Sequence, residues 1–321
     1  MERLSTAVLD AFGIHSRGIK KEKGHYRVNT PGGLVRLHIT NESAEAIRTQ
    51  HAIKEHLAKH DFPATDRYLV AKSGHPYIVM GRDTYVAATY PSSQQETDFD
   101  NEREALQSFE TLARFHKAAH HLPREKIAVS AQQPDHYSRQ QQELVQAGKH
   151  ARRGPRMSDF DVAFITHAPR MGEIMEEAAE QLTKTNYAKL YAQAIAQGSL
   201  CHNAMKEENF DGSGSYLINF SQAALDLQLT DLAALIRRYA QRSNKNISAN
   251  HLVEVYDTIN PLPSQAIDIL HAQLIFPWAF MKLVSQFYSK KRNWTPIGLI
   301  SRMETVLAER EAYDIYVRAL R

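Results

Sequence analysis

The sequence contains a single cysteine, Cys201, and no excess of one charge, because 39 Lys+Arg residues stand against 36 Asp+Glu. One cysteine cannot form an internal disulfide, and it gives no paired ligands for a zinc ribbon. A net charge of +3 is too small to indicate nucleic-acid binding. We therefore expect a protein of a reducing compartment that binds no nucleic acid.

Long hydrophobic runs are also missing. The N-terminal segment carries Glu2, Arg3 and Asp10 among its apolar residues, which predicts no signal peptide. The most apolar window, Leu274–Val284, is interrupted by a proline and a lysine and is shorter than the roughly 20 residues that a bilayer requires. The sequence thus predicts no membrane insertion and a buried helix that bends at Pro277.

Strand signals are concentrated in the first third of the chain. Two alternating runs flank Pro31-Gly32-Gly33 and predict a hairpin, and a helix capped by Asn41 follows and ends before Asp61. The predicted strands are His25–Thr30, Leu34–Ile39, Tyr68–Ala71, Tyr77–Met80 and Thr84–Tyr90. A turn at Pro91-Ser92-Ser93 closes this part.

Beyond residue 100 the periodicity is helical, except for a turn-rich stretch at 199–221 that can form a small hairpin. The predicted helices are Glu102–Ala119, Tyr137–Ala151, Ile165–Leu182, Tyr187–Gln197, Leu232–Arg242, Ala249–Ile259, Ser264–Tyr288 and Ile297–Leu320. This order predicts an α+β chain with a sheet lobe at 1–91 and a helical lobe at 92–321.

The order of a sheet lobe and a helical lobe suits a phosphotransferase. Such enzymes hold nucleotide phosphates with a lysine on the third strand, orient the acceptor with a loop aspartate, and bind magnesium with a second aspartate at a strand end. Their loop reads His-x-Asp-x-x-x-x-Asn. Here His202 and Asn209 are in register, and Asn203 and Ala204 follow the histidine. Asn219, in Leu217–Phe220, takes the place of the metal aspartate.

This frame resembles the aminoglycoside phosphotransferase and choline kinase branch of the protein-kinase-like superfamily, in which Asp-Leu-Ala follows the metal site, as Asp231-Leu232-Ala233 does here. Within that branch the chain looks most like the CotS-type spore coat kinase-like proteins of endospore-forming bacteria. The segments that carry this second resemblance are Leu112–His116, Tyr256-Asp257, Pro261-Leu262, Leu274, Phe276-Pro277, Tyr288, Lys290-Lys291 and Trp294.

The resemblance implies a two-lobe protein-kinase-like fold, with a small antiparallel-sheet N-lobe carrying one helix and a large helical C-lobe. It implies other spore coat proteins as partners, and a protein made in the cytoplasm of the sporulating cell that assembles into the coat. ATP and magnesium are the ligands of the superfamily.

At three positions where the frame requires a charged residue, this sequence has an uncharged or weakly charged one. Ala204 stands where the loop aspartate belongs, and a methyl group can neither accept a proton nor orient a hydroxyl. The amide of Asn219 is a poorer magnesium ligand than a carboxylate. The strand lysine falls on His38, or less well on Arg36. We therefore expect no intact catalytic residue, no metal site, vestigial nucleotide or metal positions at His38, Asn209 and Asn219, and ATP and magnesium binding in doubt.

Two alternatives to this pseudokinase interpretation stay open. The first is an active phosphotransferase in which Glu207, Glu208 and Asp211 take over the acid–base or metal roles. The second is a nucleotide-binding sensor without catalysis. The sequence does not separate the sensor from a structural component of the coat.

Other candidates have simpler interpretations. Cys201 and His202 are adjacent on a strand and point to opposite faces, which disfavours a nucleophilic dyad. His116, His120 and His121 have a spacing that zinc can use, but we favour a solvated helix end. The run from Lys149 to Arg156 is expected to be a loop, less often an anion or partner site, and Asp231 is expected to cap its own helix.

Overall fold

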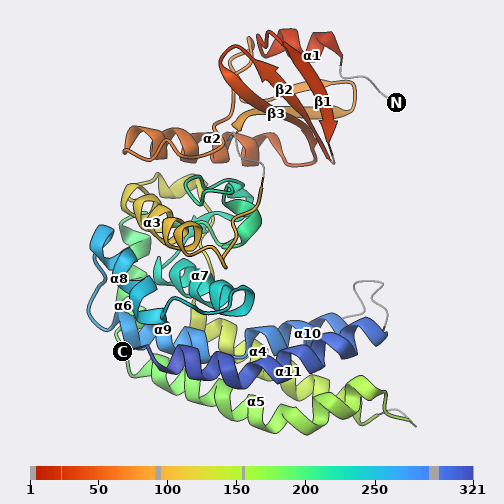
Figure 1. The fold of residues 1–321 in the computed structure, drawn as a ribbon, viewed down its shortest axis with the longest axis vertical. Coiled ribbons are helices and arrows are strands. Elements are labelled where there is room, and N and C mark those ends of the chain that lie inside the picture. Colours follow the sequence, from red (N-terminus) through yellow and green to blue (C-terminus); the bar gives the residue numbers. More distant parts are fainter. Residues whose placement is uncertain (1–4, 23, 91–94, 154–155, 289–295, 321) are drawn as a thin grey trace.

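The computed structural model describes residues 5–22, 24–90, 95–153, 156–288 and 296–320. An antiparallel five-stranded sheet with the order β1-β2-β3-β5-β4 forms the N-terminal part (Figure 1). Its strands are β1 (Gly18–Glu22), β2 (His25–Thr30), β3 (Gly33–Thr40), β4 (Ile78–Met80) and β5 (Asp83–Tyr90). The predicted hairpin is confirmed as β2 and β3, in which Thr30 pairs with Gly33 across the turn.

The two faces of the sheet are covered differently. One face packs against α1 (Thr6–Ala11), and Val8, Val28 and Leu37 are buried between them. The other face packs against α2 (Ala44–Lys59), whose Ile47 contacts the strand residue Val86. Figure 1 shows α2 between the sheet and the helical part of the chain. The sheet face that carries α2 is therefore the one turned toward the helices.

Three details of this part differ from the sequence-based expectations. Ser43, not Asn41, caps α2, because the Ser43 hydroxyl accepts from the Ala46 N–H. The predicted strand Tyr68–Ala71 is wrong as a strand; only Tyr68 forms a bridge, with Ala88 of β5. The edge strand β1 and the helix α1 were not predicted, because β1 is rich in lysine and α1 is short.

The rest of the described chain is largely helical. Its helices are α3 (Glu102–Ala118), α4 (Gln133–Ala151), α5 (Asp159–Thr183), α6 (Tyr187–Ala196), α7 (Leu229–Arg242), α8 (Ala249–Ile259), α9 (Ala266–Ile275), α10 (Trp278–Tyr288) and α11 (Pro296–Arg318). They share one large hydrophobic core. The predicted α+β order of a sheet lobe followed by a helical lobe is thus confirmed. The turn at 91–93, Gly154-Pro155, Lys290-Lys291 and Trp294 lie outside the described residues.

The predicted helix Ser264–Tyr288 is two helices rather than one bent helix, because the chain breaks between α9 and α10 at Phe276 and Pro277. Proline has no N–H to continue the helical ladder, which explains the break. By length and hydropathy alone the stretch 266–288 could cross a bilayer, but 67% of its most apolar window is buried inside the protein. Burial of that kind is typical of a core helix.

The two parts are joined through the segment between α2 and the helices. The Leu217 N–H donates to the Ala64 carbonyl at 3.0 Å, and Thr65 forms a parallel bridge with Leu217. The Phe115 ring of α3 lies 5.8 Å from the Phe62 ring and 5.7 Å from the Phe220 ring, measured between centroids. These contacts place residues 217–220 beside the end of α2, at the junction of the two lobes.

Candidate functional site

The predicted loop frame lies between the two strands of a small sheet in the helical lobe. Strand β6 (Leu200–Cys201) pairs antiparallel with β7 (Ala224–Leu225), and the loop begins at His202. His202 is fully buried, and its Nε2 bonds the Ile218 carbonyl oxygen at 2.9 Å. Burial lowers the pKa of His202 and keeps the ring neutral. A neutral imidazole with this contact holds residues 202 and 218 together across the site.

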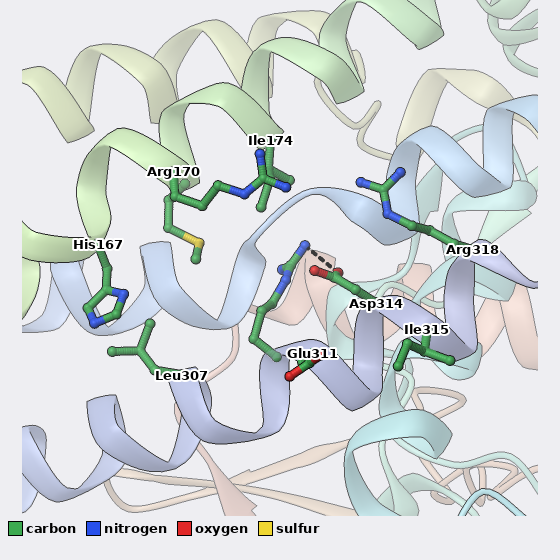
Figure 2. A pocket seen from close by; sticks show the side chains of 10 residues that line it. His167, Arg170, Ile174, Leu307, Glu311, Asp314, Ile315 and Arg318 are labelled. Carbon is green, nitrogen blue, oxygen red and sulfur yellow. Dashed lines mark ion pairs between the residues drawn. The ribbon is translucent and has the colours of Figure 1, made fainter.

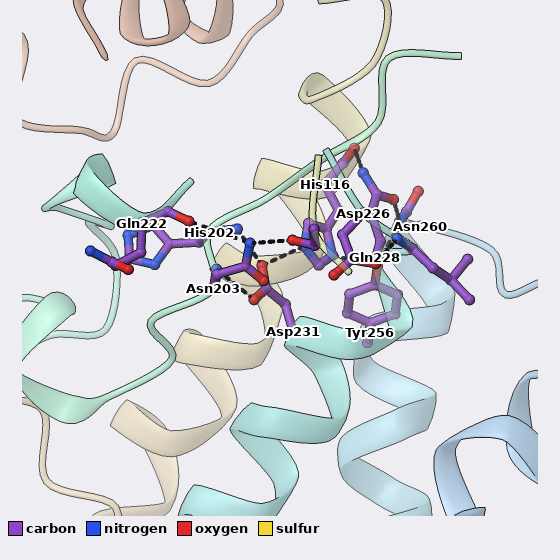
Figure 3. A network of polar contacts seen from close by, with 11 residues as sticks. His116, His202, Asn203, Gln222, Asp226, Gln228, Asp231, Tyr256 and Asn260 are labelled. Carbon is purple, nitrogen blue, oxygen red and sulfur yellow. Dashed lines mark hydrogen bonds and ion pairs between the residues drawn. The ribbon is translucent and has the colours of Figure 1, made fainter. Parts of the chain in front are cut away.

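Asp231 organises the same loop from α7 (Figure 3). Its Oδ2 accepts from the His202 N–H at 2.5 Å and its Oδ1 from the Asn203 N–H at 2.9 Å. The His116 Nε2 lies 3.2 Å from the same Oδ2, and the His116 Nδ1 bonds the Tyr256 hydroxyl at 2.7 Å. The expectation that Asp231 caps its own helix is therefore wrong, because its carboxylate binds the loop backbone instead.

Asn203 adopts a left-handed conformation with φ of 60°. Its side-chain amide donates to the Ser130 hydroxyl at 3.2 Å and faces the Gln222 carbonyl at 3.4 Å. Asparagine tolerates this backbone region better than most residues. The Asn203 side chain thus holds the loop against the segments that contain Ser130 and Gln222. The next residue, Ala204, stands at the position where the frame predicts the catalytic aspartate.

The two amides at the expected metal position bond to each other. The Asn219 Nδ2 donates to the Asn209 Oδ1 at 3.2 Å, and the Asn209 Nδ2 donates to the Ala204 carbonyl at 2.7 Å. The Asn219 Oδ1 accepts from the Ser221 hydroxyl at 2.8 Å. A magnesium ion prefers carboxylate and water oxygens. Neither side chain brings a negative charge, and the side-chain oxygens of both amides already accept hydrogen bonds, so this pair does not fit a magnesium ion.

His38 lies on β3, on the sheet face that carries α2. Burial, and to a lesser extent the charge of Arg36, lowers the pKa of His38 to about 4. The imidazole is therefore neutral at pH 7 and cannot attract phosphate as a lysine ammonium would. The sequence frame predicts a cation at position 38, and burial leaves the His38 ring uncharged.

A buried lysine lies close to this position and was missed by the sequence analysis. Lys54 of α2 is fully buried, and its Nζ lies 2.9 Å from the Asp66 Oδ1. The same Nζ is 3.7 Å from the centroid of the Tyr68 ring and 5.8 Å from that of Phe220. The ammonium is thus enclosed by a carboxylate and aromatic faces. The signal in the sequence was the helical spacing: Lys54 lies seven residues after Ile47 and three before Leu57, on the apolar face of the helix.

The three carboxylates of the active-enzyme alternative are engaged elsewhere. The Glu207 Oε2 pairs with the Arg238 Nε at 2.5 Å, and the Glu208 Oε1 pairs with the Lys206 Nζ at 3.3 Å. The Asp211 Oδ1 accepts from the backbone N–H groups of Ser215 and Tyr216 at 2.8 and 3.0 Å. These contacts stabilise the loop and give the carboxylates structural partners.

Asp226 is a second titratable group that sequence reasoning missed. It follows β7, has 2% of its surface exposed, and accepts from the Leu227 N–H at 2.7 Å. Burial, with a smaller contribution from the neighbouring Asp231 carboxylate, raises the pKa of Asp226 to about 7. A carboxyl group that titrates near neutral pH so close to the loop makes the stability of this region sensitive to pH.

The cysteine candidate Cys201 and the histidine candidate His116 are both buried in the interior of the helical lobe. Cys201 is fully buried and burial raises the pKa of its thiol, which opposes nucleophilic reactivity. His116 is buried rather than part of a solvated helix end, and His120 bonds the Ser199 hydroxyl at 3.0 Å. Among the described residues, one group of side chains could approach a metal, namely His116, Cys201 and Asp231. The hydrogen bonds of His116 and Asp231 already account for their ligand atoms.

A cavity of about 500 Å³ lies away from this loop, between α5 and α11 (Figure 2). Its arginines have carboxylate partners: Arg170 with Glu173, Arg318 with Glu177, and Arg310 with Asp314. The lining residues are His167, Arg170, Met171, Ile174, Leu307, Arg310, Glu311, Asp314, Ile315 and Arg318. Because its charges are balanced, we assign no ligand to it.

Comparisons with known proteins agree with this architecture. The chain is similar to an aminoglycoside phosphotransferase from Alicyclobacillus acidocaldarius, with a TM-score of 0.83, 17% identity, and coverage of 99% of this chain and 96% of that one. It is also similar to an AMP-bound spectinomycin phosphotransferase, with a TM-score of 0.68, 10% identity, and 96% of each chain covered. At these identities the likeness concerns the fold.

Sequence comparison identifies the family. The chain is 21% identical over 294 residues to the endospore coat-associated protein YutH of Bacillus subtilis (strain 168), which covers 89% of this chain and 84% of that protein. The family model described as "Spore coat putative kinase YutH" matches residues 5–320. The expected relationship to spore coat kinase-like proteins is confirmed, and the chain belongs to the spore coat YutH kinase family.

Proposed function

We propose that this protein is a pseudokinase that serves as a structural or interaction component of the bacterial spore coat. The observation that carries the proposal is the hydrogen bond between Asn219 and Asn209, which occupies the expected metal position with two neutral amides. Electrostatic stabilisation of the transferring phosphoryl group supplies most of the rate of phosphoryl transfer. Without a metal carboxylate, with Ala204 at the base position and with a neutral His38, that stabilisation is lost.

The fold around this position is nevertheless well held. The buried network of His116, His202 and Asp231 fixes the loop backbone, and the Lys54–Asp66 ion pair lies at the junction of the two lobes. A chain that keeps its interior while its reactive groups are neutral is suited to present surfaces to partners. Membership of the spore coat family and similarity to a coat-associated protein support other coat proteins as those partners.

The active phosphotransferase alternative has less support. It requires Glu207, Glu208 or Asp211 to reach a substrate, whereas Glu207 is paired with Arg238 and Asp211 binds backbone N–H groups of its own loop. Using these carboxylates would require breaking contacts that hold the loop. The sensor alternative differs from our proposal only in whether nucleotide binds, which a binding measurement decides.

Complementation of a deletion strain tests the proposal. We would express the wild-type chain, His38→Gln and Asn219→Gly during sporulation, and measure the amount of each in extracted coats. Glycine is chosen at position 219 because that residue has φ of 67°. We expect both variants, once shown to be folded, to enter the coat within about twofold of wild type, because the proposal assigns the coat role to surfaces and not to these two side chains. Wild-type protein that stays in the cytoplasm, or folded variants that fail to restore the coat, would contradict the proposal.

A further inference from the structure

The end of the helical lobe at which α4 ends and α5 begins is strongly basic. Figure 1 shows this end at the periphery of the lobe, beside the end of α10. The sequence from 144 to 158 holds no acidic residue. Within the part of the chain that the structure describes, its four lysines and arginines are exposed and none forms an ion pair. They are Lys149, Arg152, Arg153 and Arg156.

Helix geometry explains only part of this concentration of charge. The run that begins with Lys149 was predicted as a loop, but it starts in the last turn of α4, where a cation interacts favourably with the helix dipole. Arg152 follows the helix, and its Nη1 donates to the Gly148 carbonyl at 3.2 Å. Arg153 and Arg156 lie beyond the helix, and among the described residues neither side chain forms a hydrogen bond. These two arginines therefore have no structural role in the fold that we can identify.

The two carboxylates that follow these cations in the chain do not neutralise them. The Asp161 Oδ2 accepts from the Ser158 N–H and hydroxyl at 2.9 and 2.7 Å, and its Oδ1 accepts from the Tyr288 hydroxyl at 2.6 Å. Asp159 is exposed and, within the described part of the chain, forms no ion pair. Four cations against two carboxylates leave a net charge of +2 at this end of the lobe.

Two apolar side chains are exposed next to the cations. Met157 is 54% exposed, and Val162, in the first turn of α5, is 50% exposed. Between them Phe160 is fully buried, and its ring stacks on the Phe287 ring of α10 at 4.0 Å between centroids. This contact and the Ser158 capping box hold the start of α5 in place. Met157 and Val162 are therefore held at the surface, beside the arginines.

We propose that this basic end of the helical lobe binds the surface of a membrane that contains acidic phospholipids. Lysine and arginine are attracted to such a surface, and guanidinium groups bond its phosphates. Apolar side chains between the cations enter the headgroup layer, and no segment has to cross the bilayer. A peptide partner needs a groove or a sheet edge, whereas this end lies at the periphery of the lobe and suits a flat surface (Figure 1). The proposal is independent of the proposed function, because it requires neither the coat role nor the loss of catalysis. The basic end consists of Lys149, Arg152, Arg153, Arg156, Met157 and Val162.

Cosedimentation of the full chain with lipid vesicles tests the proposal. One set of vesicles is pure phosphatidylcholine, and the other contains about 30% phosphatidylglycerol to supply an acidic surface. We expect binding to the acidic vesicles that weakens as salt is added, and no binding to the neutral ones. Absence of binding to the acidic vesicles, or equal binding to both sets, would overturn the proposal. So would saturable binding of a glutamate-rich peptide without vesicle binding, because the basic end would then dock an acidic protein.

Exposed lysines beyond the other end of α5 supply a matched control. Lys184 follows α5 and Lys189 belongs to α6, and both are exposed, as are Arg153 and Arg156. The 25 residues of α5 span about 37 Å, several times the Debye length of about 10 Å. We expect Arg153→Gln with Arg156→Gln to weaken vesicle binding at least about tenfold, and Lys184→Gln with Lys189→Gln to change it less than about twofold. Equal losses in the two double variants would show general charge attraction and refute the site.

An apolar pair of variants distinguishes entry into the headgroup layer from charge attraction alone. Met157→Ser should weaken binding to the acidic vesicles severalfold and leave its salt dependence unchanged, because it removes apolar contact and no charge. Ile315→Ser is the control, since Ile315 is 68% exposed in the last turn of α11, at the end of that helix that lies away from the basic end (Figure 1). We expect the control to change binding less than about twofold. Equal effects of the two variants would contradict the proposal.

Discussion

The side-chain amide of Asn219 donates to the Oδ1 of Asn209 over 3.2 Å, at the place where the kinase frame expects a magnesium-binding carboxylate. The Asn209 amide is held in turn by the Ala204 carbonyl, so its Oδ1 has a fixed direction. The donor at position 219 is therefore matched to a fixed acceptor.

Asn219→Asp should destabilise the protein in EDTA, because a carboxylate oxygen would then face the Asn209 Oδ1 with no hydrogen between them. We expect a loss of about 1–3 kcal/mol in the free energy of unfolding. Magnesium should restore part of it, since a carboxylate and an amide oxygen are both ligands that magnesium accepts. Denaturant unfolding with and without magnesium measures both effects. Asn219→Gly is the control, and an equal magnesium response in that variant would refute the explanation.

Removing one partner of the buried ion pair between Lys54 and Asp66 should cost more stability than replacing both partners. Asp66→Asn leaves a buried ammonium without its carboxylate, and breaking a buried pair in this way costs about 3–5 kcal/mol. The double variant Lys54→Met with Asp66→Asn should lose less than Asp66→Asn alone, because no uncompensated charge remains. Denaturant unfolding of wild type, both single variants and the double variant forms the test. Additive losses would mean that the two residues do not interact.

Asp226 should make stability fall as the pH rises toward and through 7. Its pKa is raised to about 7 in the folded protein, against an ordinary value near 3.8, so the folded state binds the extra proton between these values. Its contribution is complete below pH 3.8 and is lost as the pH rises through 7, by at most about 1.4 kcal/mol per unit. Asp226→Asn should remove this slope. We would compare the two proteins between pH 5 and 8; parallel curves would contradict the assignment.

His38 should act in the opposite direction at lower pH. Its folded pKa of about 4 lies below its ordinary value of 6.5, so the unfolded chain binds more protons in this interval. Stability from the neutral buried ring is complete above pH 6.5 and is lost as the pH falls toward 4. His38→Gln should flatten the acid side of the stability curve. NMR titration of the His38 ring checks the cause, and a midpoint near 6.5 would refute it.

Gly214 lies so close to α3 that its position leaves no room for a side chain. It has φ of +71°, and a Cβ at this position would lie 2.6 Å from the Glu104 carbonyl oxygen and 2.7 Å from the Ser108 hydroxyl. Gly214→Ala should therefore lower the free energy of unfolding by about 1–3 kcal/mol or more, from backbone strain and this contact. Gly74→Ala is the matched control, because Gly74 also has positive φ but no atom within 4 Å of its Cβ. Equal losses in the two variants would leave strain as the only cause.

Local patterns predicted much of the fold. The hairpin of β2 and β3 and the helix Ala249–Ile259 follow from alternation and helical periodicity, which are properties of the residues themselves. The edge strand β1 carries Lys20 and Lys21, so its composition argued against a strand and only pairing with β2 shows it. Pro277 marked a bend, but the full break after Ile275 depends on how α9 and α10 pack.

The sequence predicted where in the chain the residues of the candidate site lie, but not which partners their side chains contact. The loop spacing located His202, Asn209 and Asn219 in one region, and the structure brings them together. The sequence did not indicate that Lys54 and Asp226 are buried at the site, because the burial of a charged side chain depends on segments that are distant in sequence. The partner of Asp231 was likewise hidden, since the His202 N–H that it accepts from lies 29 residues away in sequence.

The most direct test of the account is the melting temperature of the purified protein with saturating ATP, measured in magnesium and in EDTA. A ligand that binds the folded state raises the melting temperature by mass action. We predict that magnesium adds nothing to any shift that ATP produces, because the Asn209–Asn219 pair brings no charge to hold the ion. A shift that requires magnesium, accompanied by turnover of ATP, would show that the kinase site works and would contradict the pseudokinase proposal.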